Sequence, residues 1–319
     1  ALDAAREARV LHGTNARFRG GVRLVGYRLN ADTVKASETL GLNLYWALDR
    51  FSPDDLDDVA VWVHFENDNG KPRYVADYYT TIGRNGTEKA REGDKKTPLG
   101  VYHVTGNLQK DYLVKTYGNQ STLYGDGAFP LNYPNDWDRR LRRNGHGIWL
   151  HGVPFDTYSR PPRASDGCVA LTNEDLLAIS KHVQVGITPV IISPKVEWVD
   201  ADAGQKTREA LMQSLEGWRA DWESRNTDKY LRHYSRKFAS GKHDLAAWAQ
   251  QKRFLNNGKS WIKVKIDHVS MFLYPGSNDL AVVTFEQDYA SSNVSNKMRK
   301  RQYWQREGVT WRIVHEGAA

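Results

Sequence analysis

The most informative stretch of this chain is His151–Val169, which reads HGVPFDTYSRPPRASDGCV and contains the only cysteine of the 319 residues. A thiol becomes a good nucleophile when a neighbouring imidazole takes its proton. His151 ends a short apolar run, and Cys168 follows 17 positions later, after a loop rich in proline and arginine. This order predicts two antiparallel strand edges that bring the two side chains together, as catalysis by proximity requires.

Two glycines flank these side chains. Gly167 precedes Cys168 and permits a close backbone approach, so amide N–H groups there are candidates for an oxyanion hole. Gly152 follows His151 and offers no side chain, which leaves a backbone carbonyl to orient the imidazole. A plainer interpretation also stands on the residues alone, in which Cys168 is a small buried hydrophobe.

The single cysteine and the histidine spacing argue against a metal centre. One Cys excludes an intrachain disulfide and any cysteine-rich zinc module. His146 and His151 are five positions apart, and residues five apart in an extended strand face opposite sides. We therefore expect no metal and no cofactor.

The charge of the chain is basic, with a net value of +7 and an isoelectric point near 9.3. Such a balance favours polyanionic surroundings, including nucleic acid, anionic lipid or an acidic cell-wall polymer. The basic, aromatic run 297–306 (KMRKRQYWQR) is expected to be a strand with a solvated face, and we predict no nucleic-acid binding. No window approaches the roughly 18 apolar residues that a membrane span needs. The opening ALDAAR has no signal-peptide pattern, which suggests a mature or trimmed chain, or one without a signal.

Three regions are predicted along the chain. Residues 1–50 form an N-terminal extension, without a clear period over 1–20 and with two strands around the polar turn 30–39. Residues 51–197 begin with a hairpin around 67–71 and continue through a polar loop (84–100), a strand (101–106) and a long irregular segment (107–147) of the kind that often forms a lid. Thr172 and Asp175 then mark a helix start, and ITPVIIS closes the region as a buried strand.

Residues 205–319 are predicted to be a separate α+β domain. Leu211, Leu215, Trp218 and Trp222 are spaced to lie on one face of a helix over 206–224. Two further helical stretches (227–238 and 244–256) precede four strand-like runs. Three helices followed by an antiparallel sheet form an α+β unit, in which the Trp stripe is expected to be core.

The motif around Cys168 resembles the signature of L,D-transpeptidases of the YkuD fold, in the order His151-Gly152, then Ser165-x-Gly167-Cys168-Val169. Two upstream segments strengthen the resemblance. TPLGVY (97–102) is similar to the family's TPxGxY segment, and GRNG (83–86) with EGD (92–94) is similar to its upstream loop. The C-terminal region is similar to an NTF2-like domain, a pairing that resembles cell-shape-determining L,D-carboxypeptidases of Gram-negative envelopes. The resemblance implies a mainly β YkuD-type catalytic domain plus an α+β NTF2-like domain.

The resemblance also implies a mechanism on peptidoglycan stem peptides. Cys168 would attack a murein tetrapeptide and expel its terminal D-Ala, with His151 as base and later acid and the Gly152 carbonyl orienting it. The amides of Gly167 and Cys168 would hold the oxyanion. Substrate contacts are expected from Arg160, Arg163, Ser165, Asp166, Trp149 and His146. Asp166 is a departure, because many family members carry His there.

Several alternatives stay open at this point. The thioester can pass to an amine (transpeptidation) or to water (carboxypeptidation), and a hydrolase that detaches a protein from murein is a variant of the second. A different class is a non-catalytic envelope protein that binds or scaffolds through the NTF2-like cavity. The substrate implies the periplasm or cell envelope, and the NTF2-like domain suggests a homodimer.

Overall fold

The computed structural model describes residues 12–17, 22–29, 42–48, 61–66, 72–195 and 201–319, and the side chains of residues 78–195 and 204–319. The chain divides into two units, residues 1–57 and 58–319, which are taken separately here. Within the described residues, no helix is long and apolar enough to cross a membrane.

The N-terminal unit contains one antiparallel sheet. Its strands are β1 (His12–Arg17), β2 (Val22–Leu29) and β3 (Leu42–Leu48), in the order β1-β2-β3. The two strands predicted within 21–48 are confirmed as β2 and β3, while the predicted turn lies outside the described residues. Strand β1 lies within residues 1–20, where the sequence shows no clear period. The strand pairs with β2 through backbone hydrogen bonds. Such bonds do not require an apolar period in the side chains, so the sequence pattern gave no sign of the strand.

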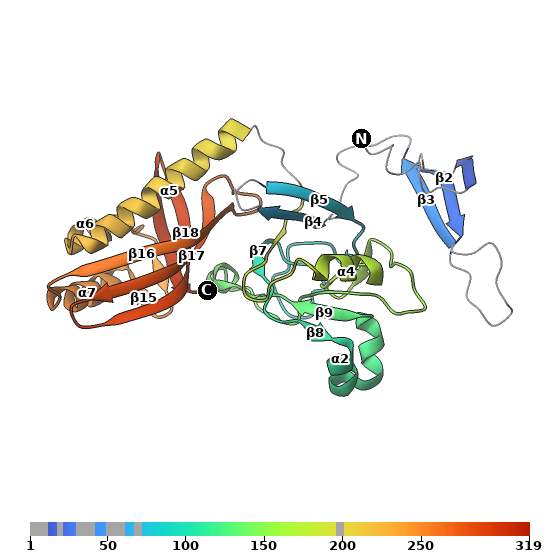
Figure 1. The fold of residues 1–319 in the computed structure, drawn as a ribbon, viewed down its shortest axis with the longest axis horizontal. Coiled ribbons are helices and arrows are strands. Elements are labelled where there is room, and N and C mark those ends of the chain that lie inside the picture. The colour runs from blue at the N-terminus through green and yellow to red at the C-terminus, as the bar shows by residue number, and fades with distance from the viewer. Residues whose placement is uncertain (1–11, 18–21, 30–41, 49–60, 67–71, 196–200) are drawn as a thin grey trace. The chain divides into compact units, whose positions relative to one another are not determined.

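The region from residue 61 to residue 192 is built from short strands with few helices (Figure 1). Its strands are β4 (Val61–Glu66), β5 (Pro72–Tyr78), β6 (Ile82–Gly83), β7 (Gly100–His103), β8 (Leu108–Gln109), β9 (Gly127–Pro130), β10 (Trp149–His151), β11 (Arg163–Ser165), β12 (Val169–Ala170) and β13 (Pro189–Ile192). Its helices are α2 (Lys110–Tyr117), the 3-10 helix η2 (Gly118–Tyr124), α3 (Asp136–Arg140) and α4 (Asn173–Ser180). One four-stranded sheet has the order β12-β10-β9-β8, and two-stranded pairs surround it.

The pairing of β10 with β12 is parallel, which corrects the predicted antiparallel arrangement of His151 and Cys168. Parallel neighbours need a crossover of about a dozen residues or more. The loop between the two strands supplies such a crossover, so the same spacing is compatible with both directions and the sequence alone did not separate them.

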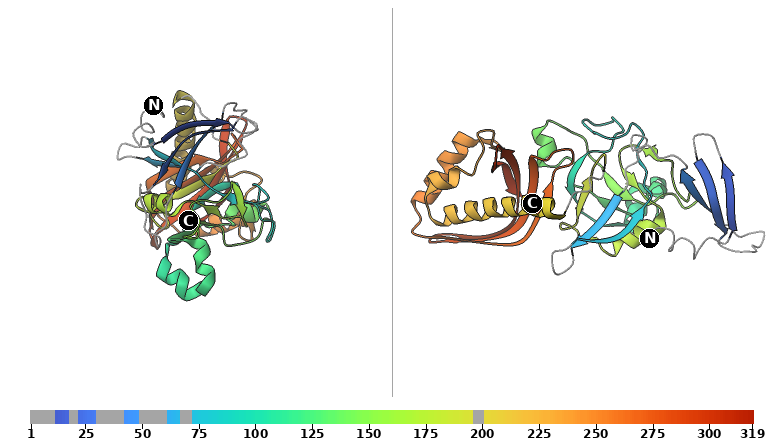
Figure 2. Two further views of the ribbon diagram at one scale, coloured as in Figure 1. Left: turned by 90° about the vertical axis from the view of Figure 1, so that its right-hand side faces the viewer. Right: turned by 90° about the horizontal axis from the view of Figure 1, so that it is seen from above.

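The segment 107–147, predicted to be irregular, contains β8, α2, η2, β9 and α3. Figure 2 shows α2 and η2 projecting from the rest of the region 61–192. Only Leu113 of α2 is buried, so this helix has little of the apolar periodicity by which helices are predicted. Helix α4 was predicted correctly, and Thr172 Oγ1 caps it by accepting from the Asp175 amide at 3.1 Å.

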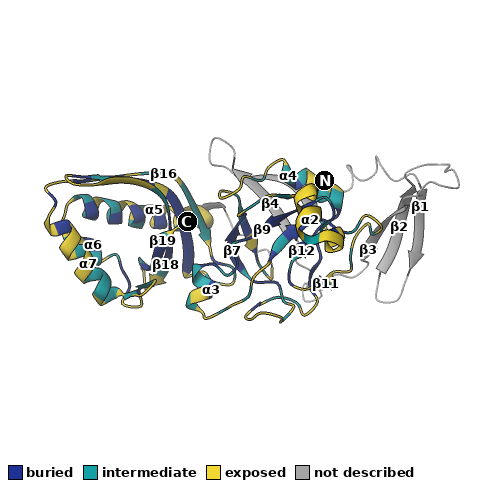
Figure 3. Ribbon diagram, turned by 90° about the horizontal axis from the view of Figure 1, so that it is seen from below, coloured by how far each residue is buried: buried dark blue, intermediate teal, exposed yellow. Residues whose placement is uncertain are grey.

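The C-terminal region places helices against a long sheet of order β16-β17-β18-β19 (Figure 1). Its elements are α5 (Ala201–Glu223), α6 (Thr227–Leu231), β14 (Ala239–Ser240), β15 (His243–Asp244), α7 (Leu245–Asn257), β16 (Ile262–Leu273), β17 (Leu280–Ser291), β18 (Ser295–Glu307) and β19 (Thr310–Ala318). The predicted stripe of Leu211, Leu215, Trp218 and Trp222 is buried in the core of this domain. Figure 3 shows buried and exposed positions alternating along α5.

Helix α6 is shorter than the predicted stretch 227–238. Beyond it, Tyr234 and Phe238 still reach the core, but from irregular backbone in which Tyr234 bridges Ile313 of β19. The spacing of the apolar residues in 227–238 predicted a helix throughout, but tertiary packing gives the second half of this stretch an irregular backbone.

A separate apolar cluster joins the catalytic strand β7 to the C-terminal sheet. Its members are Val101, Tyr274, Leu280, Val282, Tyr303 and Val314. Next to it, the guanidinium of Arg301 hydrogen-bonds Nδ1 of His103 at 3.0 Å, and both side chains are buried. A Cβ at Gly100 would lie 2.5 Å from the hydroxyl of Tyr274, so the close approach of the two surfaces requires glycine here.

Candidate active site

The turn that carries Cys168 lies between β11 and β12 and is closed by its own side chains. Ser165 Oγ donates to the Cys168 carbonyl at 2.6 Å and accepts from the Gly167 amide at 3.1 Å. Gly167 has φ +128°, and a Cβ there would lie 2.7 Å from the Lys96 carbonyl oxygen. Glycine is therefore required both for the backbone conformation and for space. The turn presents a half-buried thiol.

The upstream loop closes on this turn through Thr97, which is fully buried. Thr97 Oγ1 donates to the Gly167 carbonyl at 2.9 Å and accepts from the Gly83 amide at 2.8 Å. The two upstream segments that carried the family resemblance thus pack directly against the turn of the predicted nucleophile.

The pairing of β10 with β12 brings Cys168 beside the strand that carries His151. Leu150 lies opposite Val169 and His151 opposite Ala170, and Cys168 directly precedes Val169. Cys168 Sγ donates to the Gly147 carbonyl at 3.2 Å.

The imidazole of His151 is oriented by the backbone. His151 is buried, and its Nδ1 lies 2.6 Å from the carbonyl oxygen of Gly152. Because a carbonyl can only accept, Nδ1 carries the hydrogen and Nε2 keeps its lone pair. The Gly152 amide in turn donates to the Tyr124 carbonyl at 3.1 Å. The predicted carbonyl orienter is thus within hydrogen-bonding distance of the ring.

Asn173 was missed by sequence reasoning and holds the His151 side of the site. Its Oδ1 accepts from the amides of Asp126 (3.1 Å) and Val153 (3.3 Å), and its Nδ2 donates to the Val153 carbonyl at 2.9 Å. A Cβ at Gly152 would collide with this amide group. Asn173 is the first residue of α4, so the sequence pattern indicates only that a helix begins there. The pattern does not indicate contacts with residues 20 or more positions earlier.

An aromatic wall stands beside His151, in which Trp149 was predicted as a substrate contact and Tyr117 and Tyr124 were missed. The ring of Tyr124 meets the imidazole edge-on at a centroid distance of 5.3 Å, and it packs on Trp149 at 4.9 Å. Tyr117 contacts both Tyr124 and Trp149. Burial raises the pKa of Tyr124, and so would the negative charge of a Cys168 thiolate, which places the phenol near the sulfur as well.

The two reactive groups are both neutral at rest. Burial raises the pKa of the Cys168 thiol to about 11, against a backbone hydrogen bond from Trp149 that lowers it. Burial also lowers the pKa of His151 to about 4, against the hydrogen bond to Gly152. At neutral pH the site therefore holds a thiol and a neutral imidazole, the protonation states in which an imidazole can act as a general base toward a thiol.

These directions predict a distinct pH dependence. Alkylation of Cys168 by iodoacetamide should accelerate about tenfold per pH unit through the neutral and mildly alkaline range, because the reactive thiolate is a small fraction there. Catalytic turnover should persist to mildly acid pH and fall near pH 4, where His151 gains its proton. Intact-mass kinetics over a pH series would measure the first effect. A rate of alkylation that levels off below neutral pH would instead reveal a preformed thiolate.

The predicted substrate contacts occupy different surroundings. Arg160 donates weakly to the Leu123 carbonyl at 3.4 Å. Burial has the largest effect on the pKa of both Cys168 and His151, and the positive charge of Arg160, a smaller effect, lowers each of these pKa values. Asp166 is exposed and pairs with Arg84 at 2.5 Å. Arg163 is exposed at the start of β11.

The remaining predicted contacts are less open to a substrate. The hydroxyl of Ser165 donates to the Cys168 carbonyl within the turn and accepts from the Gly167 amide. The Gly167 amide, one of the two expected oxyanion donors, is therefore already bonded to Ser165, whereas the Cys168 amide is not. Trp149 belongs to the aromatic wall. His146 is exposed, and its amide donates to Glu92 Oε2 at 3.0 Å.

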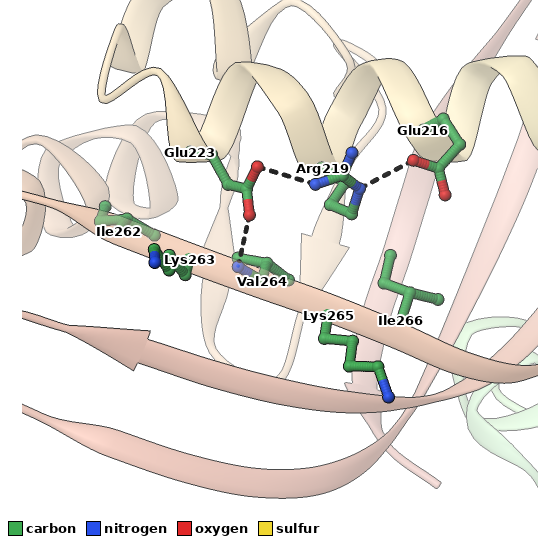
Figure 4. Close-up of a pocket in the computed structure, with 8 residues that line it drawn as sticks. All are labelled: Glu216, Arg219, Glu223, Ile262, Lys263, Val264, Lys265 and Ile266. Carbon is green, nitrogen blue, oxygen red and sulfur yellow. Dashed lines mark hydrogen bonds and ion pairs between the residues drawn. The ribbon is translucent and has the colours of Figure 1, made fainter.

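Other parts of the described structure offer no comparable chemistry. Among the described residues, no three His, Cys, Asp or Glu side chains are grouped so as to hold a metal ion. A groove of about 590 Å³ lies between α5 and β16 (Figure 4). There Arg219 pairs with Glu216 and Glu223 at 2.7 Å each, and Glu223 accepts from the Val264 amide. These groups satisfy one another, and the groove is lined by residues far from Cys168 in the sequence and in a different domain.

The fold and the site together define a YkuD-type domain followed by an NTF2-like domain. Residues 55–192 match the family model of the YkuD L,D-transpeptidase catalytic domain, and residues 210–317 match that of the Cds6 C-terminal NTF2-like domain. The chain therefore contains both domains, which confirms the resemblance and the fold class predicted from the sequence.

Two solved structures are similar to this chain over most of its length. Bd1075 of Bdellovibrio bacteriovorus has 29% sequence identity and a TM-score of 0.66, over 82% of this chain and 88% of that chain. The helical cell shape determining protein Pgp2 of Campylobacter jejuni has 25% identity and a TM-score of 0.68, over 82% and 89%. No curated protein matches the chain.

Proposed function

We propose that this protein modifies peptidoglycan by cysteine acyl transfer on the tetrapeptide stem, releasing the terminal D-Ala. The observation that supports the proposal is the parallel pairing of β10 with β12, which brings Cys168 beside the strand of His151, while Nδ1 of His151 is bonded to Gly152. That placement occurs within a YkuD L,D-transpeptidase domain. The similarity to Pgp2, a cell-shape determinant, supports the same class of substrate.

In the first half-reaction, Nε2 of His151 takes the proton of the Cys168 thiol as the sulfur attacks the carbonyl carbon at the L-centre of diaminopimelate. The C–N bond to D-Ala then breaks, and the imidazolium returns its proton to the departing amine. This leaves a thioester on Cys168. The Gly152 carbonyl stabilises the transient imidazolium, because it accepts from Nδ1 in both protonation states of the ring.

The Cys168 amide is the proposed donor to the oxyanion that develops on the attacked carbonyl. The Ser165 hydroxyl accepts from the Gly167 amide and donates to the Cys168 carbonyl, so the backbone is fixed both before and after the Cys168 amide. Such preorganised donors act without reorganisation in the transition state, and one of them is worth about 10²–10³ in rate.

The second half-reaction determines which enzyme this is. Water at the thioester gives a tripeptide and makes the protein an L,D-carboxypeptidase, whereas an amine of a second stem gives a crosslink and makes it an L,D-transpeptidase. His151 activates either nucleophile as base. The cell envelope is the proposed location, because the substrate lies there.

Incubation with purified disaccharide-tetrapeptide, with and without an acceptor stem, tests the proposal. We expect loss of one D-Ala by mass spectrometry. Tripeptide as the end product identifies the carboxypeptidase, and a 3–3 crosslinked dimer identifies the transpeptidase. Disaccharide-tripeptide, which lacks the terminal D-Ala, is the matched control donor and should give no acyl transfer. Intact tetrapeptide in both reactions would reject the proposal.

A further inference from the structure

One buried ion pair near the nucleophile is not used by the chemistry above. Lys89 is only 2% exposed, and its Nζ lies 2.8 Å from Asp94 Oδ1. Asp94 also accepts from three backbone amides, those of Ala90 (2.8 Å), Arg91 (3.0 Å) and Lys96 (3.1 Å). Burial alone would raise the pKa of Asp94, but these hydrogen bonds lower it far below its usual range, so it is fully ionised.

The loop that Asp94 closes contacts the nucleophile turn on one side. The Lys96 carbonyl lies against Gly167, where no Cβ would fit, and Thr97 donates to the Gly167 carbonyl at 2.9 Å. Since the Lys96 amide is bound by Asp94, the carboxylate fixes the residues that press on the turn of Cys168.

The same loop contacts the segment that accepts the hydrogen bond of the Cys168 thiol. The Asn144 amide donates to the Ala90 carbonyl at 3.1 Å, and the His146 amide donates to Glu92 at 3.0 Å. A Cβ at Gly145 would lie 3.1 Å from Cε of Lys89, so the lysine stem lies against this segment. The Gly147 carbonyl that accepts from Cys168 Sγ follows two residues later. Residues 84–97, which we call the bracket loop, therefore contact both the turn of Cys168 and the segment of its acceptor.

We propose that the Lys89–Asp94 pair is a positioning element for the nucleophile, in which Asp94 fixes the bracket loop and Lys89 holds a positive charge close to the sulfur. This inference rests on the proposed function. Asp166, Arg160, Lys89, His151 and Tyr124 are the titratable groups whose contacts or charges place them around the thiol. Of these, Lys89 is the one that also belongs to the bracket loop.

Two substitutions separate the two parts of the role. Lys89→Met removes the charge but leaves Asp94 its three backbone amides, so the loop should keep its fold. We expect alkylation of Cys168 by iodoacetamide at about pH 8 to slow severalfold, because the positive charge of Lys89 favours the thiolate. Asp94→Asn weakens the loop instead. We expect kcat for D-Ala release to fall about 10²-fold with KM little changed, since small misplacements of reacting groups cost about that much, while alkylation does not slow.

Lys95→Met is the matched control, because Lys95 is an exposed lysine of the same loop and its loss changes the net charge equally. It should change neither rate. An alkylation rate for Lys89→Met equal to the wild-type rate, or a kcat for Asp94→Asn equal to that of the wild type, overturns the inference. The alkylation assay needs no peptidoglycan, so it decides the role of Lys89 even if the wild-type protein does not release D-Ala. That second result would reject the proposed function alone.

Discussion

A Cys168→Ala variant is expected to lose D-Ala release by at least about 10⁴-fold, because nucleophile and base act as a unit and removing the nucleophile leaves only binding and oxyanion stabilisation. It should also form no covalent adduct with a carbapenem, whose strained amide acylates an activated thiol in the wild-type protein. Intact-mass measurement identifies the adduct unambiguously, since Cys168 is the only thiol of the chain.

The fold of this variant serves as its control. Cys168 is half-buried, and its sulfur donates to the Gly147 carbonyl, so alanine should leave thermal unfolding nearly unchanged. Retention of the carbapenem adduct after the substitution would contradict the assignment of the nucleophile. A wild-type thiol that reacts with neither carbapenem nor iodoacetamide would instead favour the alternative of a binding or scaffold protein.

Replacement of His151 by alanine should lower D-Ala release about 10²- to 10⁴-fold, which is the usual contribution of a positioned general base. The thiol itself remains, so alkylation by iodoacetamide at high pH should continue in this variant. That difference separates loss of the base from loss of the nucleophile. Steady-state release of D-Ala and intact-mass alkylation measure the two effects.

The matched control is His182→Ala, because His182 is an exposed histidine to which no role in the reaction is assigned. We expect its turnover to stay close to that of the wild type. His151 is buried, so its removal also leaves a cavity, and thermal unfolding should be recorded for both variants. Turnover retained in His151→Ala would move the base to another residue.

The sequence indicated the fold class through short motifs and one apolar stripe. Thr97, Gly167 and Cys168 could be linked in advance because their residue types and order matched a known signature, and the structure brings them into direct contact. The helix that carries Trp218 and Trp222 was predictable because its apolar side chains repeat at helical spacing and are buried together.

Other features left no local signal. The direction of β12 depends on where the crossover loop leads, which spacing does not encode. The contacts of Asn173 with Asp126 and Val153 join segments far apart in the sequence, as does the close approach of the Lys89 side chain to Gly145. Residues such as Asn173 and Lys89 belong to no recognisable sequence pattern, so their contacts become visible only in the folded structure.

The apolar cluster that joins β7 to the C-terminal sheet has a consequence for how the two domains evolve. Gly100 and Val101, which belong to the TPLGVY segment near the nucleophile, are also the residues that meet Tyr274 and Tyr303 of the accessory domain. Genetic exchange that replaced one domain alone would leave an unmatched, water-exposed apolar surface on the other. The two halves are therefore expected to descend together, with the catalytic motif and its accessory partner diverging in step.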